Sequence, residues 1–159
     1  DSIREKKQAV LHMDIPTDWE LYGDPFYWTQ ILFNLVENAL KQNTEPGLSI
    51  TVAAAKTQDA CVITVTDTGV GIPAESIPFL FNRFYRVETH HSSEIRGTGL
   101  GLSIVKRAVE AHDGAITVSS IPHRETVFTI TIPLKRFREE KRIRQLSQVS
   151  IETSANKST

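Results

Sequence analysis

Four polar residues in the segment 30–43 stand at helical spacing. At positions i, i+3, i+4 and i+7, they are Asn34, Glu37, Asn38 and Lys41. A helix would bring all four onto one face and leave apolar residues on the other. Amide oxygens and an ammonium group suit a bound metal ion and phosphate groups. The stripe is therefore unusual for a solvated helix face and is a candidate binding surface.

Two glycine-rich segments add further candidates. Asp67 ends an apolar strand pattern and is followed by Gly69 and Gly71. This pattern fits a plain turn as well as a binding loop, in which the carboxylate could accept a hydrogen bond from an exocyclic amine. The segment 97–102 (GTGLGL) opens a helical pattern, where free backbone N–H groups favour phosphate. No Gly-Lys-Ser/Thr follows, as a Walker loop requires. Leu102 stands where a Rossmann fingerprint needs its last glycine or an alanine.

An aromatic segment lies between the two glycine segments. We predict a short helix over 75–84, with Phe81 and Phe84 packed into the core. Arg83 and Arg86, three residues apart, would share a face, so one of them could reach a phosphate.

The elements that must position these residues follow from the sequence pattern. We predict a helix that starts at Asp24-Pro25, where aspartate caps the helix and proline suits its first turn. Before it, residues 2–12 form a short helix or an extended lead-in. After it come strands 48–56 and 60–67, the short helix, a loop over 87–96, a helix over 97–112, and strands 115–120 and 127–133. The order predicts an α+β fold, a two-layer α/β sandwich with helices on one face of a mixed sheet.

Length and composition narrow the class of protein. The 159 residues suit one domain, and a net charge of −1 gives no reason to expect nucleic-acid binding. No run of about 18 apolar residues is present, so we expect no membrane segment here. The single Cys61 falls in a strand pattern, which predicts a buried, inert thiol. The pair His90-His91 has no third ligand at zinc spacing, so we interpret it as part of a solvated loop.

Taken together, these segments resemble the catalytic ATP-binding domain of two-component sensor histidine kinases, in the GHKL (Bergerat-fold) superfamily. The N box, first glycine box, F box and second glycine box correspond to residues 34–41, 67–73, 79–86 and 97–102. The resemblance covers about 23–133. We therefore expect a catalytic domain in 1–134 and a basic, polar tail in 135–159, partly helical or disordered. Because the chain begins at Asp1, we also expect it to be a piece of a longer protein.

The resemblance implies ATP and Mg²⁺ as cofactors and assigns roles to residues. Asn38 would hold Mg²⁺ with Asn34 beside it, and Asp67 would bind the adenine amine. Asn38, Lys41 and Arg86 would be catalytic, the last two through the phosphates. The base pocket and the remaining nucleotide contacts would involve Gly69, Gly71, Ile72, Tyr85, Gly97, Thr98, Gly99, Leu100, Gly101 and Leu102. The loop 87–96 would be the ATP lid.

Asn34 separates the subfamilies. In the gyrase-like, chaperone and mismatch-repair ATPases and in the anti-sigma serine kinases, the residue four before the metal-binding asparagine is a glutamate that acts as general base. An amide cannot accept that proton, whereas a neutral histidine already offers a lone pair. Asn34 therefore favours transfer to histidine. A GHKL serine kinase or ATPase, or an ATP-sensing module without transfer, remains the alternative. We interpret Glu37 as a partner of Lys41 at i, i+4.

The resemblance also implies partners. None of the five histidines (His12, His90, His91, His112 and His123) stands in the family's phosphoacceptor pattern. The acceptor would lie in the kinase's own dimerisation domain, absent from this sequence, and a cognate response regulator would act downstream. The chain would be a cytoplasmic portion of a membrane-anchored sensor kinase. The segment from His123 to the last strand lacks the family's usual glycines, so we expect an altered loop and an intact site.

Overall fold

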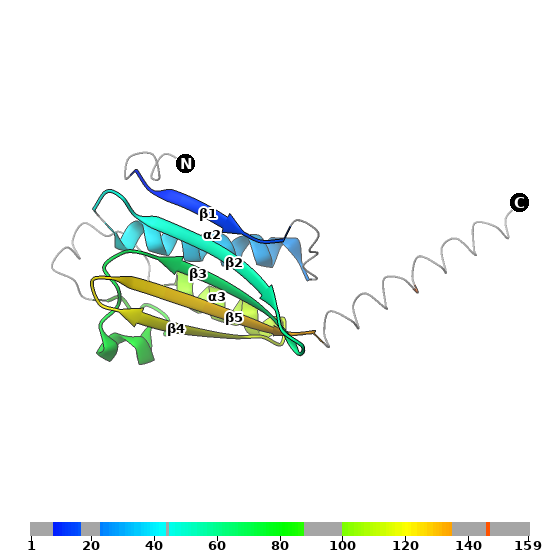
Figure 1. The fold of residues 1–159 in the computed structure, drawn as a ribbon. Coiled ribbons are helices and arrows are strands. Elements are labelled where there is room, and N and C mark those ends of the chain that lie inside the picture. Colours follow the sequence, from blue (N-terminus) through cyan, green and yellow to red (C-terminus); the bar gives the residue numbers. More distant parts are fainter. Residues whose placement is uncertain (1–7, 17–22, 44, 88–99, 135–145, 147–159) are drawn as a thin grey trace, which may run out of the picture.

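The computed structural model describes residues 8–16, 23–43, 45–87, 100–134 and 146; the remainder is grey in Figure 1. Its elements, in chain order, are β1 (Val10–Asp14), α2 (Pro25–Gln42), β2 (Ser49–Lys56), β3 (Ala60–Asp67), the 3₁₀ helix η1 (Ala74–Phe79), α3 (Gly101–Ala111), β4 (Ala115–Ile121) and β5 (Glu125–Pro133). Within these described ranges, no helix has the length and apolar character needed to cross a membrane.

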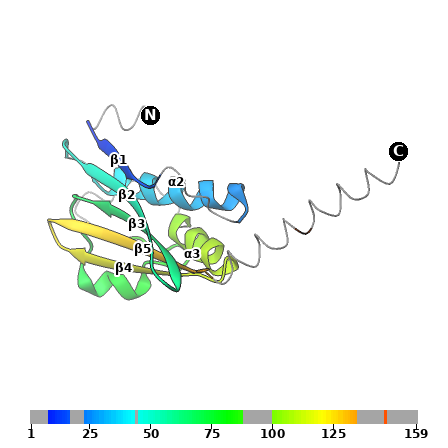
Figure 2. The same cartoon turned by 45° about the vertical axis from the view of Figure 1, so that its right-hand side comes forward.

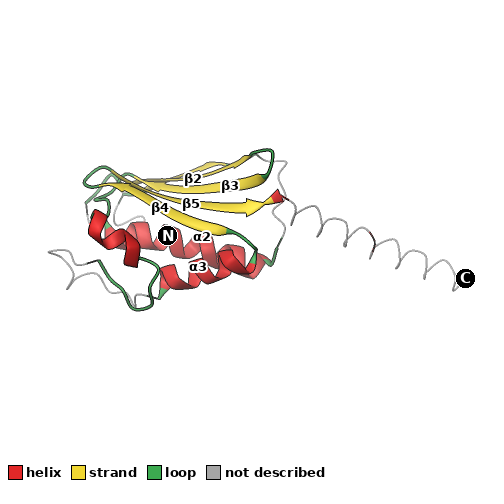
Figure 3. Cartoon of the chain, turned by 90° about the horizontal axis from the view of Figure 1, so that it is seen from below, coloured by secondary structure: helices red, strands yellow, loops and turns green. Residues whose placement is uncertain are grey.

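The strands form one mixed sheet in the order β1-β2-β3-β5-β4. β1 runs parallel to β2, and the other neighbours are antiparallel. Helices α2 and α3 lie in contact with each other on one face of this sheet (Figures 2 and 3). The predicted α+β sandwich with helices on one face of a mixed sheet is confirmed.

The core lies between the helices and the sheet because both layers present an apolar face there. Alternate residues of β3 and β5 point inward, and every third or fourth residue of α2 meets them. The largest fully buried side chains are Ile31, Leu35, Ile50, Val65, Val105, Val109, Ile130 and Ile132. Cys61 is buried among them, as predicted.

Local sequence explains where α2 begins and ends. The Asp24 carboxylate accepts a hydrogen bond from the Phe26 N–H at 2.9 Å, and Pro25 occupies the first turn. Both features were predicted. After Gln42 the backbone of Asn43 turns to an extended conformation, which ends the helix.

Two predicted elements differ from the structure. Of the lead-in, residues 1–7 lie outside the described residues, and Val10–Asp14 form a strand, so the extended alternative holds there and continues past His12. The helix predicted over 75–84 is wrong in type and length, because η1 is a 3₁₀ helix that ends at Phe79. Pro78 lacks the N–H that an α-helix would use, which favours this early end.

The Phe84 prediction is wrong as well. Phe81 is partly buried and meets Phe128 edge-on at 6.2 Å between ring centroids, as expected of a core residue. Phe84 is instead 66% exposed. Its backbone has φ +65°, a left-handed conformation, so it does not continue the helical direction that would place it beside Phe81.

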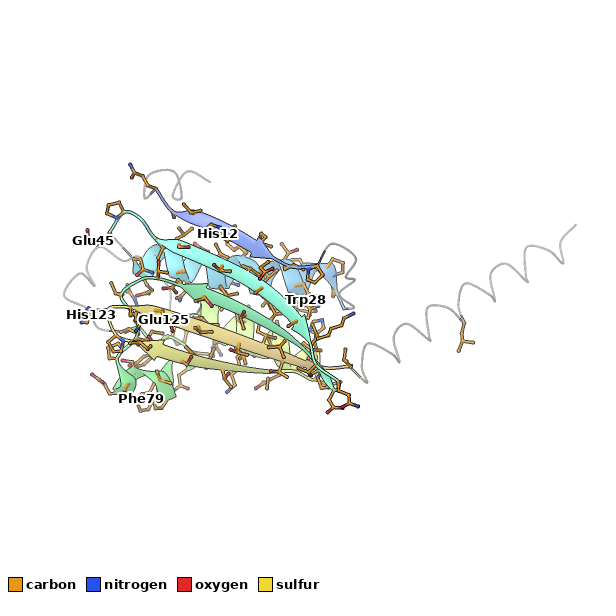
Figure 4. All side chains as sticks on the ribbon, in the orientation of Figure 1. His12, Trp28, Glu45, Phe79, His123 and Glu125 are labelled. Carbon is orange, nitrogen blue, oxygen red and sulfur yellow. The ribbon has the colours of Figure 1, made fainter. Side chains whose placement is uncertain are left out.

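The turn between β4 and β5 contains His123 at φ +63°. Glycine is the usual residue in this conformation, but histidine adopts it more often than most side chains. The His123 N–H donates to the Val70 carbonyl at 2.6 Å, so this turn holds the loop after β3. Figure 4 shows His123 at the same end of the molecule as Glu45, with Trp28 at the opposite end.

Candidate functional site

A cavity of about 320 Å³ opens between α2, the loop after β3, the segment after η1 and the start of α3. Its lining residues come from segments far apart in the sequence: Asn34, Glu37, Asn38, Lys41, Gln42, Asn43, Asp67, Val70, Gly71, Ile72, Leu80, Tyr85, Arg86, Val87, Leu100, Gly101, Leu102, Ile104 and Thr126. This volume is in the range of small-ligand sites.

Asp67 supplies a buried carboxylate to the cavity wall. It takes the fourth inward position of β3, after Cys61, Ile63 and Val65, so strand alternation turns it toward the helices. Burial raises its pKa, and hydrogen bonds from the Gly69 N–H and the Asn43 side chain act in the opposite direction. A carboxylate held this way can accept a hydrogen bond from a ligand amine.

The polar stripe of α2 forms another wall of the cavity. All four predicted residues of the stripe line the cavity. The Lys41 ammonium lies 2.6 Å from the Glu37 carboxylate, which confirms the predicted i, i+4 pair. Because both side chains are about one-third exposed, the pair adds little stability. Its lysine is consequently available to an incoming anion at low cost.

The start of α3 faces this stripe. A β-carbon on Gly101 would lie 3.5 Å from the Asn34 Oδ1 atom, so the two segments approach closely. Among the residues that the structure describes, no side chain caps this helix. The first N–H groups of any helix lack intrahelical acceptors, and the helix dipole makes this end attractive to anions. Leu100 and Leu102 line the cavity beside Gly101.

The structure separates the two arginines of the aromatic segment. Arg86 and Tyr85 line the cavity, and the Tyr85 ring lies 5.8 Å from the Phe79 ring between centroids. Arg83 is not among the lining residues, and its guanidinium lies 5.4 Å from the centroid of the Phe84 ring. Contrary to the prediction of a shared face, the two arginine side chains do not both line the cavity.

The two glycines after Asp67 have different surroundings. Gly71 lines the cavity at φ +72°, and a β-carbon there would lie 2.6 Å from the Ile121 carbonyl oxygen. Gly69 is not among the lining residues, although it was expected to shape the base pocket, and it packs against Asn43. Ile72 lines the cavity, and its N–H donates to the Ser120 hydroxyl at 2.7 Å.

Other predicted site residues fall outside the described part of the chain. Gly97, Thr98 and Gly99 are among them, as are residues 88–96 of the expected lid. Conversely, sequence reasoning missed Asn43 and Thr126. Asn43 was only the last residue of the segment 30–43, and no role was assigned to it. Thr126 lies opposite Asp67 in the β3–β5 register, and its inward position follows from alternation along β5 only once that register is known.

Oxygen ligands for a hard cation are present in the cavity. Within the described ranges, no group of three or more histidine, cysteine, aspartate or glutamate side chains could hold a metal ion. Mg²⁺ does not require such a group, because it is usually held by one or two protein oxygens together with substrate phosphates and water. The amide oxygens of Asn34 and Asn38 fit that requirement.

Comparisons with known proteins identify the family of this chain. Residues 23–136 match the family described as "Histidine kinase-, DNA gyrase B-, and HSP90-like ATPase". Sensor histidine kinase WalK of Bacillus subtilis is 39% identical over 138 residues, which are 85% of this chain and 23% of WalK. This chain thus spans less than a quarter of the length of that relative.

Solved structures lead to the same family. The mycobacterial sensor histidine kinase MprB superposes with a TM-score of 0.70 at 27% identity, over 83% of this chain and 88% of that one. Full-length ShkA in complex with AMPPNP gives 0.69 at 25% identity, over 83% of this chain and 27% of that one. The chain belongs to the family of histidine kinase-, DNA gyrase B- and HSP90-like ATPases, and within it to the ATP-binding catalytic domains of sensor histidine kinases.

Proposed function

We propose that the cavity binds Mg²⁺–ATP, with adenine at Asp67 and the phosphates between the α2 stripe and the start of α3. The observation that carries this proposal is the arrangement of one buried carboxylate and one surface with two amides and an ammonium group on the walls of a single cavity. Adenine needs an acceptor for its exocyclic amine, and a triphosphate needs donors and positive charge. The AMPPNP complex of ShkA supports this choice of ligand.

The residues take the following proposed roles. Asn38, with Asn34 beside it, holds Mg²⁺, which would neutralise phosphate charge when bound. Lys41 and Arg86 donate to phosphate oxygens, and the first N–H groups of α3 add to them. Gly71, Ile72 and Tyr85 shape the site around the nucleotide. Gly97, Thr98 and Gly99 are proposed to continue the phosphate-binding segment before Leu100, and 87–96 to cover the nucleotide.

The reaction we propose is transfer of the γ-phosphoryl group to a histidine on a separate dimerisation domain. Phosphoryl transfer depends mainly on positioning and charge neutralisation, which these residues can supply. Asn34 provides no base for activating water, and the nearby Glu37 carboxylate is engaged by Lys41. A histidine imidazole needs no such base.

The proposed setting follows from relatives such as the sensor histidine kinase WalK, of which this chain spans less than a quarter. We propose that residues 1–134 form the catalytic unit and 135–159 a tail. The whole protein would carry the dimerisation domain, signal to a response regulator, and expose this domain in the cytoplasm while anchored in the membrane.

A transfer assay tests the proposal. The chain is incubated with γ-labelled ATP and Mg²⁺, together with a separately produced dimerisation domain of a related sensor kinase that carries the acceptor histidine. We expect acid-labile, base-stable label on that domain, and a variant lacking its histidine serves as control. Release of free phosphate without transfer would support the ATPase alternative, label stable to acid the serine kinase, and binding without either product the ATP-sensing module.

A further inference from the structure

Asn43 is a buried amide at the point where α2 ends. It is 4% exposed, and its Nδ2 group donates to the Ala39 carbonyl at 2.6 Å. Its Oδ1 atom accepts from the Val70 N–H at 2.7 Å. These partners fix the orientation of the amide, because a flipped side chain would face a donor with a donor and an acceptor with an acceptor.

The same side chain also reaches the carboxylate of the cavity. Asn43 donates a hydrogen bond to Asp67 and so opposes the effect of burial on that group. The two N–H bonds of one amide can serve Ala39 and Asp67 at once. One side chain therefore joins the last turn of α2, the loop after β3 and the Asp67 carboxylate.

Gly69 is the position that makes room for this amide. A β-carbon there would lie 1.8 Å from the Asn43 Oδ1 atom, and the three nearest atoms all belong to the Asn43 side chain. The φ of Gly69 is not in the left-handed region, in contrast to that of Gly71. Space for Asn43, and not backbone conformation, is thus the reason for glycine at this position.

We propose that Asn43 is a positioning residue for adenine recognition, which sets the Asp67 carboxylate and the Val70 backbone in place, with Gly69 as its required neighbour. The inference rests on the proposed ATP site. Asn43 acts through Asp67, so its loss should weaken recognition of the adenine amine more than binding of the phosphates. A side chain that only ended the helix would have no such selectivity.

The test compares ATP with purine riboside triphosphate, which lacks the exocyclic amine, by calorimetry in the presence of Mg²⁺. Wild type should prefer ATP. Asn43→Ala should lose about tenfold in ATP affinity, the size expected for one hydrogen bond, while the analogue binds nearly as before. Asn82→Ala, a change of the same type at an exposed position outside the cavity, should leave both affinities unchanged.

A double-mutant cycle tests whether Gly69 makes room for Asn43. Gly69→Ala should weaken ATP binding strongly in the wild-type background and little in the Asn43→Ala background, because the obstructing amide is gone. If Asn43→Ala does not fold by circular dichroism, Asn43→Ser replaces it, since one hydroxyl donor cannot serve both Ala39 and Asp67. Equal losses for both nucleotides, or additive effects of the two substitutions, would overturn the proposal. Failure of wild type to bind ATP would overturn the proposed function instead.

Discussion

Alanine variants of Gly71 and Gly47 can separate the energetic cost of a close contact at the cavity wall from the cost of a left-handed backbone conformation. Both have positive φ, +72° and +88° respectively. A β-carbon at Gly47 would meet nothing within 4 Å, whereas at Gly71 it would lie 2.6 Å from the Ile121 carbonyl oxygen and 2.8 Å from the Pro122 Cα atom. Both obstructing atoms belong to the backbone, so rotation of a side chain cannot relieve the contact.

Gly71→Ala should therefore cost more stability than Gly47→Ala. The left-handed conformation costs alanine about 1–2 kcal/mol, which applies to both variants. Overpacking adds about 1–3 kcal/mol at Gly71 alone, giving about 2–5 kcal/mol there. Because domains of this kind are stable by about 5–15 kcal/mol, both variants should still fold.

Urea unfolding of the two variants and wild type measures the difference, and calorimetry with ATP measures the effect on the cavity. Gly71 and Ile72 line the cavity, so Gly71→Ala should also weaken nucleotide binding, and Gly47→Ala should not. Equal destabilisation by the two substitutions would refute the claim that the hairpin β4–β5 confines this loop.

Two further predictions concern Asp67 and Asp24. Because burial raises the folded-state pKa of Asp67 above its usual 3.8, the carboxylate lowers stability as pH rises from 3.8 through the folded-state pKa. Asp67→Asn should remove that loss, so its free energy of unfolding in urea should exceed that of wild type by an amount that grows over the same pH range. Its affinity for ATP should fall. A difference in stability that stays constant at all pH values would contradict the raised pKa of Asp67. Asp24→Ala should cost about 1 kcal/mol through loss of the helix cap, with ATP affinity unchanged, since Asp24 is not among the lining residues. A change in affinity without a change in thermal stability would contradict this account.

The local periodicities of the sequence were sufficient for most of the fold. The helical spacing of Asn34, Asn38 and Lys41 placed them on one face, and this face lines the cavity. Strand alternation turned Asp67 inward, and Asp24-Pro25 marked the start of α2. Each of these features depends on residues a few positions apart, which is why they could be predicted.

The aromatic segment shows where this reasoning failed. Spacing alone assigned Phe84 to the core and could not choose between Arg83 and Arg86. The early end of η1 and the left-handed backbone at Phe84 decided both points, and they changed the direction of the chain within a few residues.

Local sequence patterns predicted the helix with its polar stripe, the strand that ends at Asp67 and the two strands of the last hairpin. They did not show how the loop after β3 is held. Val70 meets Asn43 from 27 residues away, and Ile72 meets Ser120 from 48 residues away. Such contacts depend on which elements become neighbours in the folded chain, and no local period records them. For this reason Gly69 and Gly71 look alike in the sequence, yet one makes room for an amide and the other turns the backbone beside a hairpin.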